Sequence, residues 1–138
     1  LFVGPHSLLA PPYGSVYLDG DHSVMGPSTV QVGRLYQEAG LELDPDGSEP
    51  PDHVAIELEF AHFVTSEEAR RREEGDDRGA TKLSALRRLF LTRYLLPWAP
   101  SFCEDVQRHT ESPYFAALAG TLKSFLHDCE ASRLESDA

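Results

Sequence analysis

The stretch Asp52-His53-Val54-Ala55-Ile56-Glu57-Leu58-Glu59-Phe60-Ala61-His62-Phe63-Val64 decides the fold of this chain. On a helical wheel of 3.6 residues per turn, its apolar side chains point in almost every direction. A helix that is apolar all round is typical of the centre of a helical domain. We therefore predict a buried central helix that begins near Asp52, with Asp52 as its cap. Its carboxylates Glu57 and Glu59 would lie where there is little water, and we interpret them as residues that lock neighbouring helices rather than as catalytic groups.

Helical spacing of apolar residues continues on both sides of this stretch. We predict further helices from about Ser28 to Gly40, from Thr81 to Leu96, from Trp98 to His109, and from Ser112-Pro113 onward. The last of these carries an apolar stripe that we expect to face a core, made of Phe115, Leu118, Ala119, Leu122, Phe125, Leu126 and Cys129.

The remaining segments read as irregular. Glycines and prolines interrupt residues 1–27, and the charge run 65–79 is most simply a helix end that frays into a solvated loop. The tail from Glu130 onward is expected to fray as well. No segment shows the alternation of a strand, so the predicted fold class is all-α: a helical bundle with a looped N-terminal quarter, forming a single domain over residues 1–138.

Composition narrows the function. The chain has 138 residues, 41% of them hydrophobic, and a formal net charge of −11, which fits one soluble domain. The acidic balance argues against nucleic acid as a partner, because binding to phosphates needs clustered Lys and Arg. No stretch resembles a signal peptide or a membrane span. Cys103 and Cys129 lie in apolar helical patterns and are interpreted as small buried hydrophobes.

The negative charge is concentrated in the first part of the chain. Residues 1–79 contain 16 acids and 5 bases, whereas residues 80–138 contain 7 of each. The segment 38–59 contains eight acids without a single Lys or Arg. This segment is either a solvated acidic loop or a surface that attracts a basic partner.

One group of residues has the makings of a reactive site. His53 and Glu57 are one helical turn apart, beside Asp52, and His62 follows on the same helix. Such a group could bind a metal ion or transfer a proton, although the pair supplies only two of the four ligands that a metal site needs. A small metal-dependent or acid–base enzyme that uses His53 and Glu57 is therefore the alternative to a helical binding module.

Several motifs in order along the chain are similar to those of a known family. They are Leu1-Phe2-Val3-Gly4-Pro5, the run from Pro11 to Asp19, Gly26-Pro27-Ser28-Thr29, Glu49-Pro50-Pro51-Asp52-His53, and Leu96-Pro97-Trp98 through Phe102. Together they resemble the TorD/DmsD/NarJ family of cytoplasmic chaperones for molybdoenzymes that are exported by the twin-arginine route. The E-P-x-D-H signature of that family is matched at Glu49, Pro50, Asp52 and His53.

The resemblance implies an all-helical fold, no enzymatic reaction, and no catalytic residue, metal site or cofactor of its own. It implies that the chain binds the twin-arginine leader peptide of an exported molybdoenzyme catalytic subunit, of the DMSO-reductase type, until the cofactor has been inserted. Membrane contact would then occur only through the export machinery. The residues it nominates for leader contact are Phe2, Tyr17, Gly26, Asp52 and His53, with Pro50 shaping the hinge before the central helix.

The resemblance also marks differences from the family. This chain has His6, Tyr13 and Tyr17 where close relatives tend to have Trp, which alters the apolar pocket. The family's first helices lie upstream of Leu1, so we expect an apolar face without its cover and therefore a homodimer or larger species, with helices exchanged at the Glu49-Pro50-Pro51 hinge.

The physical chemistry agrees with a leader as the ligand. A twin-arginine leader presents two Arg side chains followed by an apolar segment, so its receptor needs carboxylates beside an apolar groove. The forked guanidinium pairs well with carboxylates. Tyr13, Tyr17 and the acidic segment 38–59 provide both kinds of group in one part of the sequence.

Overall fold

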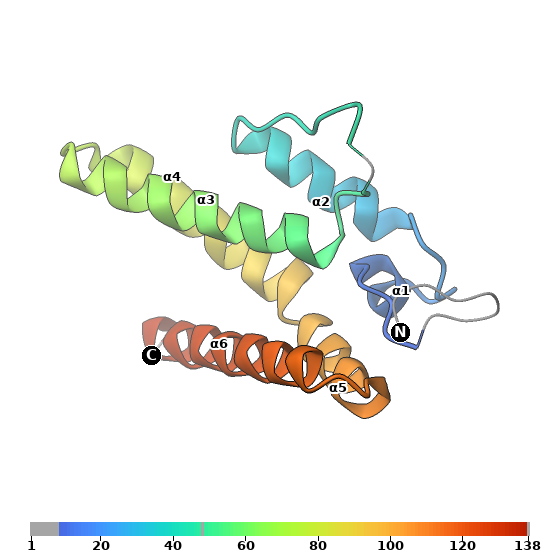
Figure 1. The fold of residues 1–138 in the computed structure, drawn as a ribbon. Helices are drawn as coiled ribbons and strands as arrows, with labels where there is room; N and C mark the ends of the chain where they lie inside the picture. Colours follow the sequence, from blue (N-terminus) through green and yellow to red (C-terminus); the bar gives the residue numbers. More distant parts are fainter. Residues whose placement is uncertain (1–8, 48, 138) are drawn as a thin grey trace. The chain divides into compact units, whose positions relative to one another are not determined.

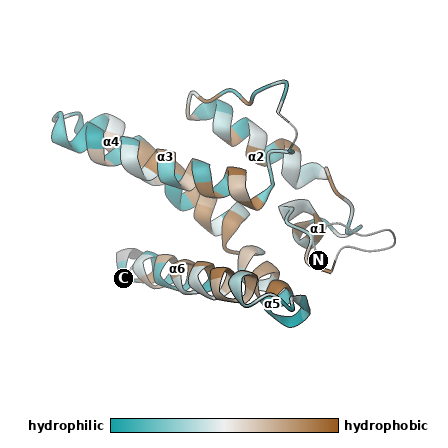
Figure 2. Ribbon diagram, in the orientation of Figure 1, coloured by the Kyte–Doolittle hydropathy of each residue, from teal (hydrophilic) through white to brown (hydrophobic). Residues whose placement is uncertain are grey.

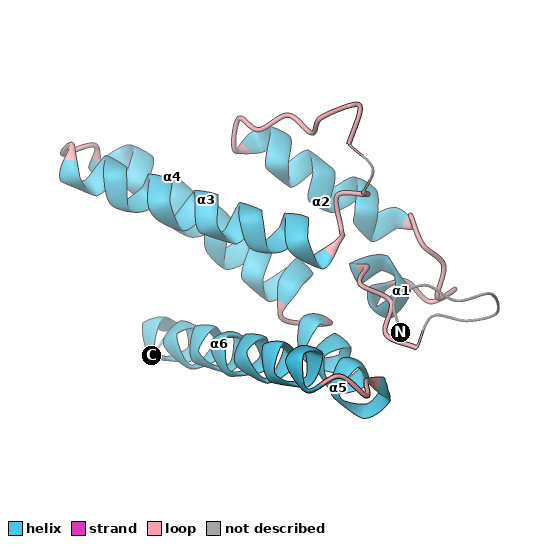
Figure 3. Ribbon diagram, viewed as in Figure 1, coloured by secondary structure: helices cyan, strands magenta, loops and turns pink. Residues whose placement is uncertain are grey.

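The computed structural model describes residues 9–47 and 49–137 of the chain, and every regular element within them is helical (Figure 3). The all-α prediction is therefore confirmed. The elements are α1 (Gly14–Leu18), α2 (Pro27–Glu38), α3 (Val54–Glu73), α4 (Asp77–Phe90), the π-helical turn η1 (Leu91–Leu95), α5 (Ala99–His109) and α6 (Pro113–Asp137).

The helices belong to two compact units. One unit spans Tyr13–Leu95 and contains α1 to η1, and the other combines Leu96–Ala138 with the start of the chain up to Pro12. That residues 1–138 act as a single domain stays a prediction. The N-terminal quarter is less irregular than predicted, because α1 interrupts the loops within it.

Helix α2 begins one residue before the predicted start at about Ser28 and ends shortly before Gly40. Pro27 occupies its first position, where the missing N–H costs nothing. Gly40 follows its C-terminus with a φ of +84°, a conformation that glycine adopts without strain. The buried residues Val32, Leu35 and Tyr36 lie on one face of the helix.

Three aromatic rings form the core of the Tyr13–Leu95 unit. The centroid of the Phe60 ring on α3 lies 4.5 Å from that of Tyr36 on α2 and 4.9 Å from that of Phe90 at the end of α4. All three residues are buried. Helices α3 and α4 run side by side over most of their length, as Figure 1 shows. Phe60 thus holds together the three long helices of this unit.

Helix α3 is buried along one row rather than all round. Its buried residues are Glu57, Phe60, Ala61, Val64 and Glu68, which follow a helical spacing. Ala55, Glu59 and His62 are exposed, so the prediction that Glu59 lies away from water is wrong. Helix α3 packs chiefly against α4 within its unit, and these three residues lie outside its buried row.

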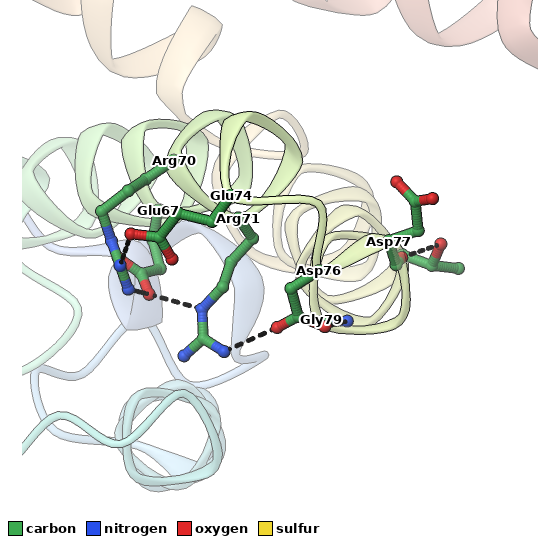
Figure 4. Close-up of polar contacts among 8 residues, drawn as sticks. Glu67, Arg70, Arg71, Glu74, Asp76, Asp77 and Gly79 are labelled. Atoms are coloured by element: carbon green, nitrogen blue, oxygen red, sulfur yellow. Dashed lines mark hydrogen bonds and ion pairs between the residues drawn. The ribbon is translucent and has the colours of Figure 1, made fainter.

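The charge run that the sequence suggested would fray is helical, and that prediction is also wrong. Helix α3 continues through Glu73 and α4 begins at Asp77, with a turn at Gly75 (φ +79°) between them. Ion pairs spaced three or four residues apart stabilise a helix. Here Arg70 Nε donates to Glu67 at 2.9 Å, and Arg70 Nη1 donates to Glu74 at 2.6 Å (Figure 4).

The same ion pairs join the two helices across the turn. Arg71 contacts Glu67 through Nε at 2.9 Å and Asp76 through Nη1 at 2.8 Å. Asp76 in turn caps α4, because its carboxylate accepts a hydrogen bond from Gly79 N (Figure 4). The hydrogen bonds from Arg70 and Arg71 lower the pKa of Glu67 to about 2. The carboxylate is therefore ionised throughout the neutral range.

In the second unit, α5 and α6 pack against each other. The side chain of Lys123 on α6 donates to Glu104 on α5 at 2.9 Å, and the rings of Trp98 and Phe102 are 5.8 Å apart. The buried residues of α5 are Ala99, Phe102, Cys103 and Val106, which is the spacing of one helix face.

The apolar stripe of α6 faces a core only in part. Ala119 and Leu126 are buried, whereas Phe115, Leu118 and Phe125 are 38%, 52% and 47% exposed. Ala119 and Leu126 are two helical turns apart, so the buried part of α6 is one row of side chains, and the stripe is wider than that row. Figure 2 shows apolar residues recurring along α6. The helix also extends to Asp137, so the predicted fraying from Glu130 is wrong. Over residues 9–47 and 49–137, no helix combines the length and hydropathy that crossing a bilayer requires.

Cys103 should be a thiol of low reactivity. Burial raises its pKa to about 11, and Lys123 only partly opposes this shift. The folded state therefore gains stability from the neutral thiol below the ordinary pKa of 9.0 and loses it as the pH rises toward 11. At about pH 8 we expect iodoacetamide to label Cys103 of a Cys129→Ser variant far more slowly in the folded than in the unfolded protein, measured by intact mass. Equal labelling rates in the folded and the unfolded protein would show that the Cys103 side chain is open to solvent.

Candidate functional site

The residues Glu49 to His53 form a loop that is fastened to α1, and we call it the acidic-proline loop. Gly14 N donates a hydrogen bond to the backbone oxygen of Asp52 at 2.9 Å, and Tyr13 and His53 form an isolated antiparallel bridge. The rings of Tyr13 and His53 meet edge to face, with centroids 5.3 Å apart. Segments almost forty residues apart in the sequence are thus brought together in one place.

Asp52 is the buried anchor of this arrangement. The residue is 1% exposed, and its Oδ2 accepts a hydrogen bond from Ser15 N at 2.8 Å. Its other oxygen, Oδ1, is buried and has no hydrogen-bond partner among the described residues. The prediction that Asp52 caps the central helix is therefore wrong. Its carboxylate turns back to α1 instead of toward the first turn of α3.

His53 is the residue that caps α3. Its Nδ1 accepts a hydrogen bond from Ala55 N at 3.1 Å, while its backbone oxygen accepts from Glu57 N. An imidazole that accepts at Nδ1 carries its proton on Nε2 in the neutral form. His53 is half-buried, so Nε2–H is the donor that remains for a ligand.

The two prolines connect the loop to its surroundings through their carbonyl groups. Pro50 O accepts from His53 N at 3.0 Å, and Pro51 O accepts from the hydroxyl of Tyr36 at 2.8 Å. Burial raises the pKa of Tyr36, and the negative charges of Glu57 and Asp52 raise it further. The Tyr36 hydroxyl therefore stays protonated and keeps donating to the loop.

Tyr13 orients the exposed carboxylate of the loop. Its hydroxyl donates to Glu49 Oε2 at 2.9 Å. Burial of the phenol and this bond to Glu49 raise the pKa of Tyr13. The site thus presents an exposed carboxylate beside two aromatic rings, those of Tyr13 and His53.

The other nominated residues lie on or after α1. Tyr17 is half-buried on α1. Gly26 precedes α2, and a side chain there would collide with Asp19, since an added Cβ would lie 2.1 Å from Asp19 Oδ2. Phe2 and His6 lie outside the described residues. The structure therefore brings together Pro50, Asp52, His53 and Tyr13, and it links Tyr17 to them through α1.

Sequence reasoning missed Ser15 and Asp19. Ser15 is completely buried and receives the Asp52 carboxylate at its backbone N–H. Asp19 supplies the side-chain cap that Gly26 cannot give to α2, since its Oδ2 accepts from both the backbone N–H and the hydroxyl of Ser28. Only the turn-forming character of the segment hinted at such a role.

The arrangement around His53 does not extend to a metal-binding cluster. In the part of the chain that the structure describes, no three side chains of His, Cys, Asp or Glu lie close enough together to hold an ion. His53 Nδ1 is engaged in capping α3, and His62 is exposed on α3. None of these three observations favours the acid–base or metal-dependent enzyme that uses His53 and Glu57.

The general class of this protein is therefore an all-α protein with a candidate binding surface. That surface is the acidic and aromatic group around the acidic-proline loop. The chain belongs to the nitrate reductase delta subunit family, whose model matches residues 1–104, and this is the TorD/DmsD/NarJ family that the motifs resemble.

Individual relatives agree with this assignment. The chain is 30% identical over 118 residues to the Tat proofreading chaperone DmsD of Salmonella typhi, covering 86% of this chain and 51% of that protein. It is 32% identical over 92 residues to the perchlorate reductase assembly chaperone protein of Dechloromonas aromatica, covering 67% and 40%. It is 28% identical over 127 residues to the chaperone protein TorD of Aliivibrio salmonicida, covering 91% and 57%. The chain spans about half the length of the curated relatives it matches.

Proposed function

We propose that this protein is a redox-enzyme maturation chaperone that binds the twin-arginine leader of an apo-molybdoenzyme and holds it until the cofactor is inserted. The relatives are named as chaperones, and two of those names refer to Tat proofreading or to assembly of a reductase. The protein would work in the cytoplasm, without catalysing a reaction, and would meet the membrane only through the export machinery.

The observation that carries the proposal is the fastening of the acidic-proline loop to α1. It brings the exposed Glu49 carboxylate next to the rings of Tyr13 and His53. An Arg side chain can donate two parallel hydrogen bonds to a carboxylate and can stack on an aromatic ring. Glu49 and His53 of the family signature, together with Tyr13, therefore form a group of side chains suited to guanidinium groups.

The segment before the loop strengthens the electrostatic part of the proposal. Glu38, Glu42, Asp44 and Asp46 are all exposed. A surface of one sign raises the local concentration of a ligand of the opposite sign and speeds its association. Exposed carboxylates fit both interpretations of segment 38–59, a solvated acidic loop and a surface that attracts a basic partner, and the proposal adopts the second.

Leader binding should weaken as salt rises. Contacts between Arg and exposed carboxylates are screened over ~8–10 Å at 0.1–0.15 M salt, whereas apolar contacts are not. We expect the affinity for a synthetic peptide with two adjacent arginines and a leucine-rich segment to fall roughly threefold or more between low and high salt, with an apolar remainder that survives. Titration calorimetry at several salt concentrations measures this.

A peptide with the arginines replaced by glutamines serves as the control. Its weaker binding should be nearly independent of salt, because only the apolar contacts remain. An affinity of the arginine peptide that does not respond to ionic strength would remove the acidic surface from the mechanism. No binding of either peptide would refute the proposed function itself.

A further inference from the structure

The loop between α1 and α2 exposes apolar side chains next to the candidate site. Val24 is 42% exposed and Met25 is 69% exposed, the largest value for a large apolar residue in the Tyr13–Leu95 unit. Single exposed apolar residues are common on protein surfaces. Val24 and Met25, however, are adjacent, and they lie on a loop that is hydrogen-bonded to α1.

Met25 is fixed in an unfavourable backbone conformation. Its φ is +66°, in the left-handed region that residues with a side chain rarely adopt. The backbone N–H of Met25 donates to the hydroxyl of Ser15 at 3.2 Å, and the N–H of Ser15 donates to Asp52. The residue that anchors the acidic-proline loop thus also supports the position of Met25, through one intermediate residue.

The far end of the loop is fixed as well. Gly26 packs so closely on Asp19 that a side chain there would displace the Asp19 carboxylate, which caps α2 through Ser28. Gly26 therefore has a structural part in shaping the loop, and its neighbour Met25 presents the side chain. His22 Nδ1 lies 3.0 Å from Val16 O, which ties the middle of the loop to α1.

The same loop carries a charge of the sign that a basic leader requires. Asp21 is exposed, and its Oδ1 accepts a hydrogen bond from Ser23 N at 3.1 Å. Hydrogen bonds from Ser23 lower the pKa of Asp21, so its carboxylate is ionised at neutral pH. No Lys or Arg occurs between Tyr13 and Gly33. The loop thus combines an anionic group with an apolar tip within five residues of sequence.

We propose that the loop Gly20–Gly26 is a specificity surface for the leader, in which Val24 and Met25 contact the apolar segment and Asp21 attracts the arginine end. This inference rests on the proposed function and adds to it the part of the protein that recognises the apolar segment. The occupant is fixed by chemistry: positive charge followed by apolar residues matches Asp21 followed by Val24 and Met25. Methionine suits this role because its unbranched, polarisable side chain adapts to apolar partners of different shape.

The test compares loop variants of the full chain in peptide binding. The variants are Met25→Ser, Met25→Leu and Asp21→Asn, and the matched control is Val30→Ser, since Val30 is 55% exposed on α2 of the same unit. The probes are the arginine and leucine-rich peptide above and a version with serines in place of its leucines. Thermal melting of each variant verifies that it is folded.

We expect Met25→Ser to weaken binding of the leucine-rich peptide by roughly tenfold and to leave binding of the serine version unchanged. Met25→Leu should restore most of the affinity, Asp21→Asn should reduce the salt dependence, and Val30→Ser should have no effect. If Met25→Ser is too unstable to assay, Met25→Gly, which accepts a positive φ, removes the same side chain without strain. Wild-type affinity in a folded Met25→Ser or Met25→Gly variant overturns the inference while the proposed function stands. Failure of the unmodified chain to bind either peptide refutes the proposed function instead.

Discussion

Replacing Phe60 by alanine is expected to lower the free energy of unfolding by roughly 3–5 kcal/mol. The Phe60 ring lies between the rings of Tyr36 and Phe90 and is 3% exposed. Its removal takes away both aromatic contacts and leaves a cavity where α2, α3 and α4 meet. A domain whose total stability is about 5–15 kcal/mol would then be close to unfolding at physiological temperature.

Chemical denaturation followed by circular dichroism measures this effect. Phe63→Ala is the matched control, because Phe63 lies on the same helix but is only half-buried and lines an open cleft of about 730 Å³. Its loss should cost much less, since solvent already reaches that side of the ring. Equal losses for the two variants would mean that the ring cluster of Phe60 is not the centre of this unit.

The helices themselves could largely be predicted from the sequence. Gly40 marks the end of α2, Pro113 marks the first position of α6, and apolar spacing places α5 where the structure has it. These signals are local, since each depends on the backbone preferences of one residue or on the period of one helix. Such local preferences do not depend on how distant parts of the chain pack.

The errors concern features that depend on partners distant in sequence. The number of charged residues in the run 65–79 suggests a solvated loop. Glu67 and Glu68, however, form ion pairs with arginines four residues later on α3, and Glu68 also pairs with Arg87 on α4. Burial opposes ionisation of Glu68, yet hydrogen bonds from Arg72 and Arg87 lower its pKa overall. Likewise α3 seemed central because its composition is apolar, whereas its packing against α4 buries only one row.

The candidate site shows the same division. The E-P-x-D-H signature located the loop, but the roles of its members are set by α1, which lies almost forty residues earlier. Nothing in the spacing of Asp52 and His53 indicates that the first binds Ser15 and the second caps α3. The contact roles of Phe2, Tyr17, Gly26, Pro50, Asp52 and His53 stay predictions, and the buried position of Asp52 changes how its part is best tested.

Replacing Asp52 should separate a positioning role from a contact role. The Asp52 carboxylate is buried and holds Ser15 N, so Asp52→Ala should cost roughly 1.5–3 kcal/mol of stability and should loosen the attachment of α1 to the acidic-proline loop. Leader affinity should then fall by about tenfold or more, because Tyr13, His53 and Met25 lose their common support. Denaturation and calorimetry on the same sample measure both effects.

Asp52→Asn decides between the two roles, because an amide oxygen can still accept from Ser15 N although the negative charge is gone. If Asp52 acts by positioning, Asp52→Asn should keep the leader affinity within about threefold of the original. His53→Ala should lose about 0.5–2 kcal/mol of stability, because it removes the cap of α3, and it should also remove the Nε2–H contact to the leader. Equal loss of affinity in Asp52→Asn and Asp52→Ala, with stability retained in the former, would instead show that the charge itself meets the arginines. The buried state of the carboxylate favours the first outcome, since a guanidinium could reach Asp52 Oδ1 only after the groups that cover it had moved.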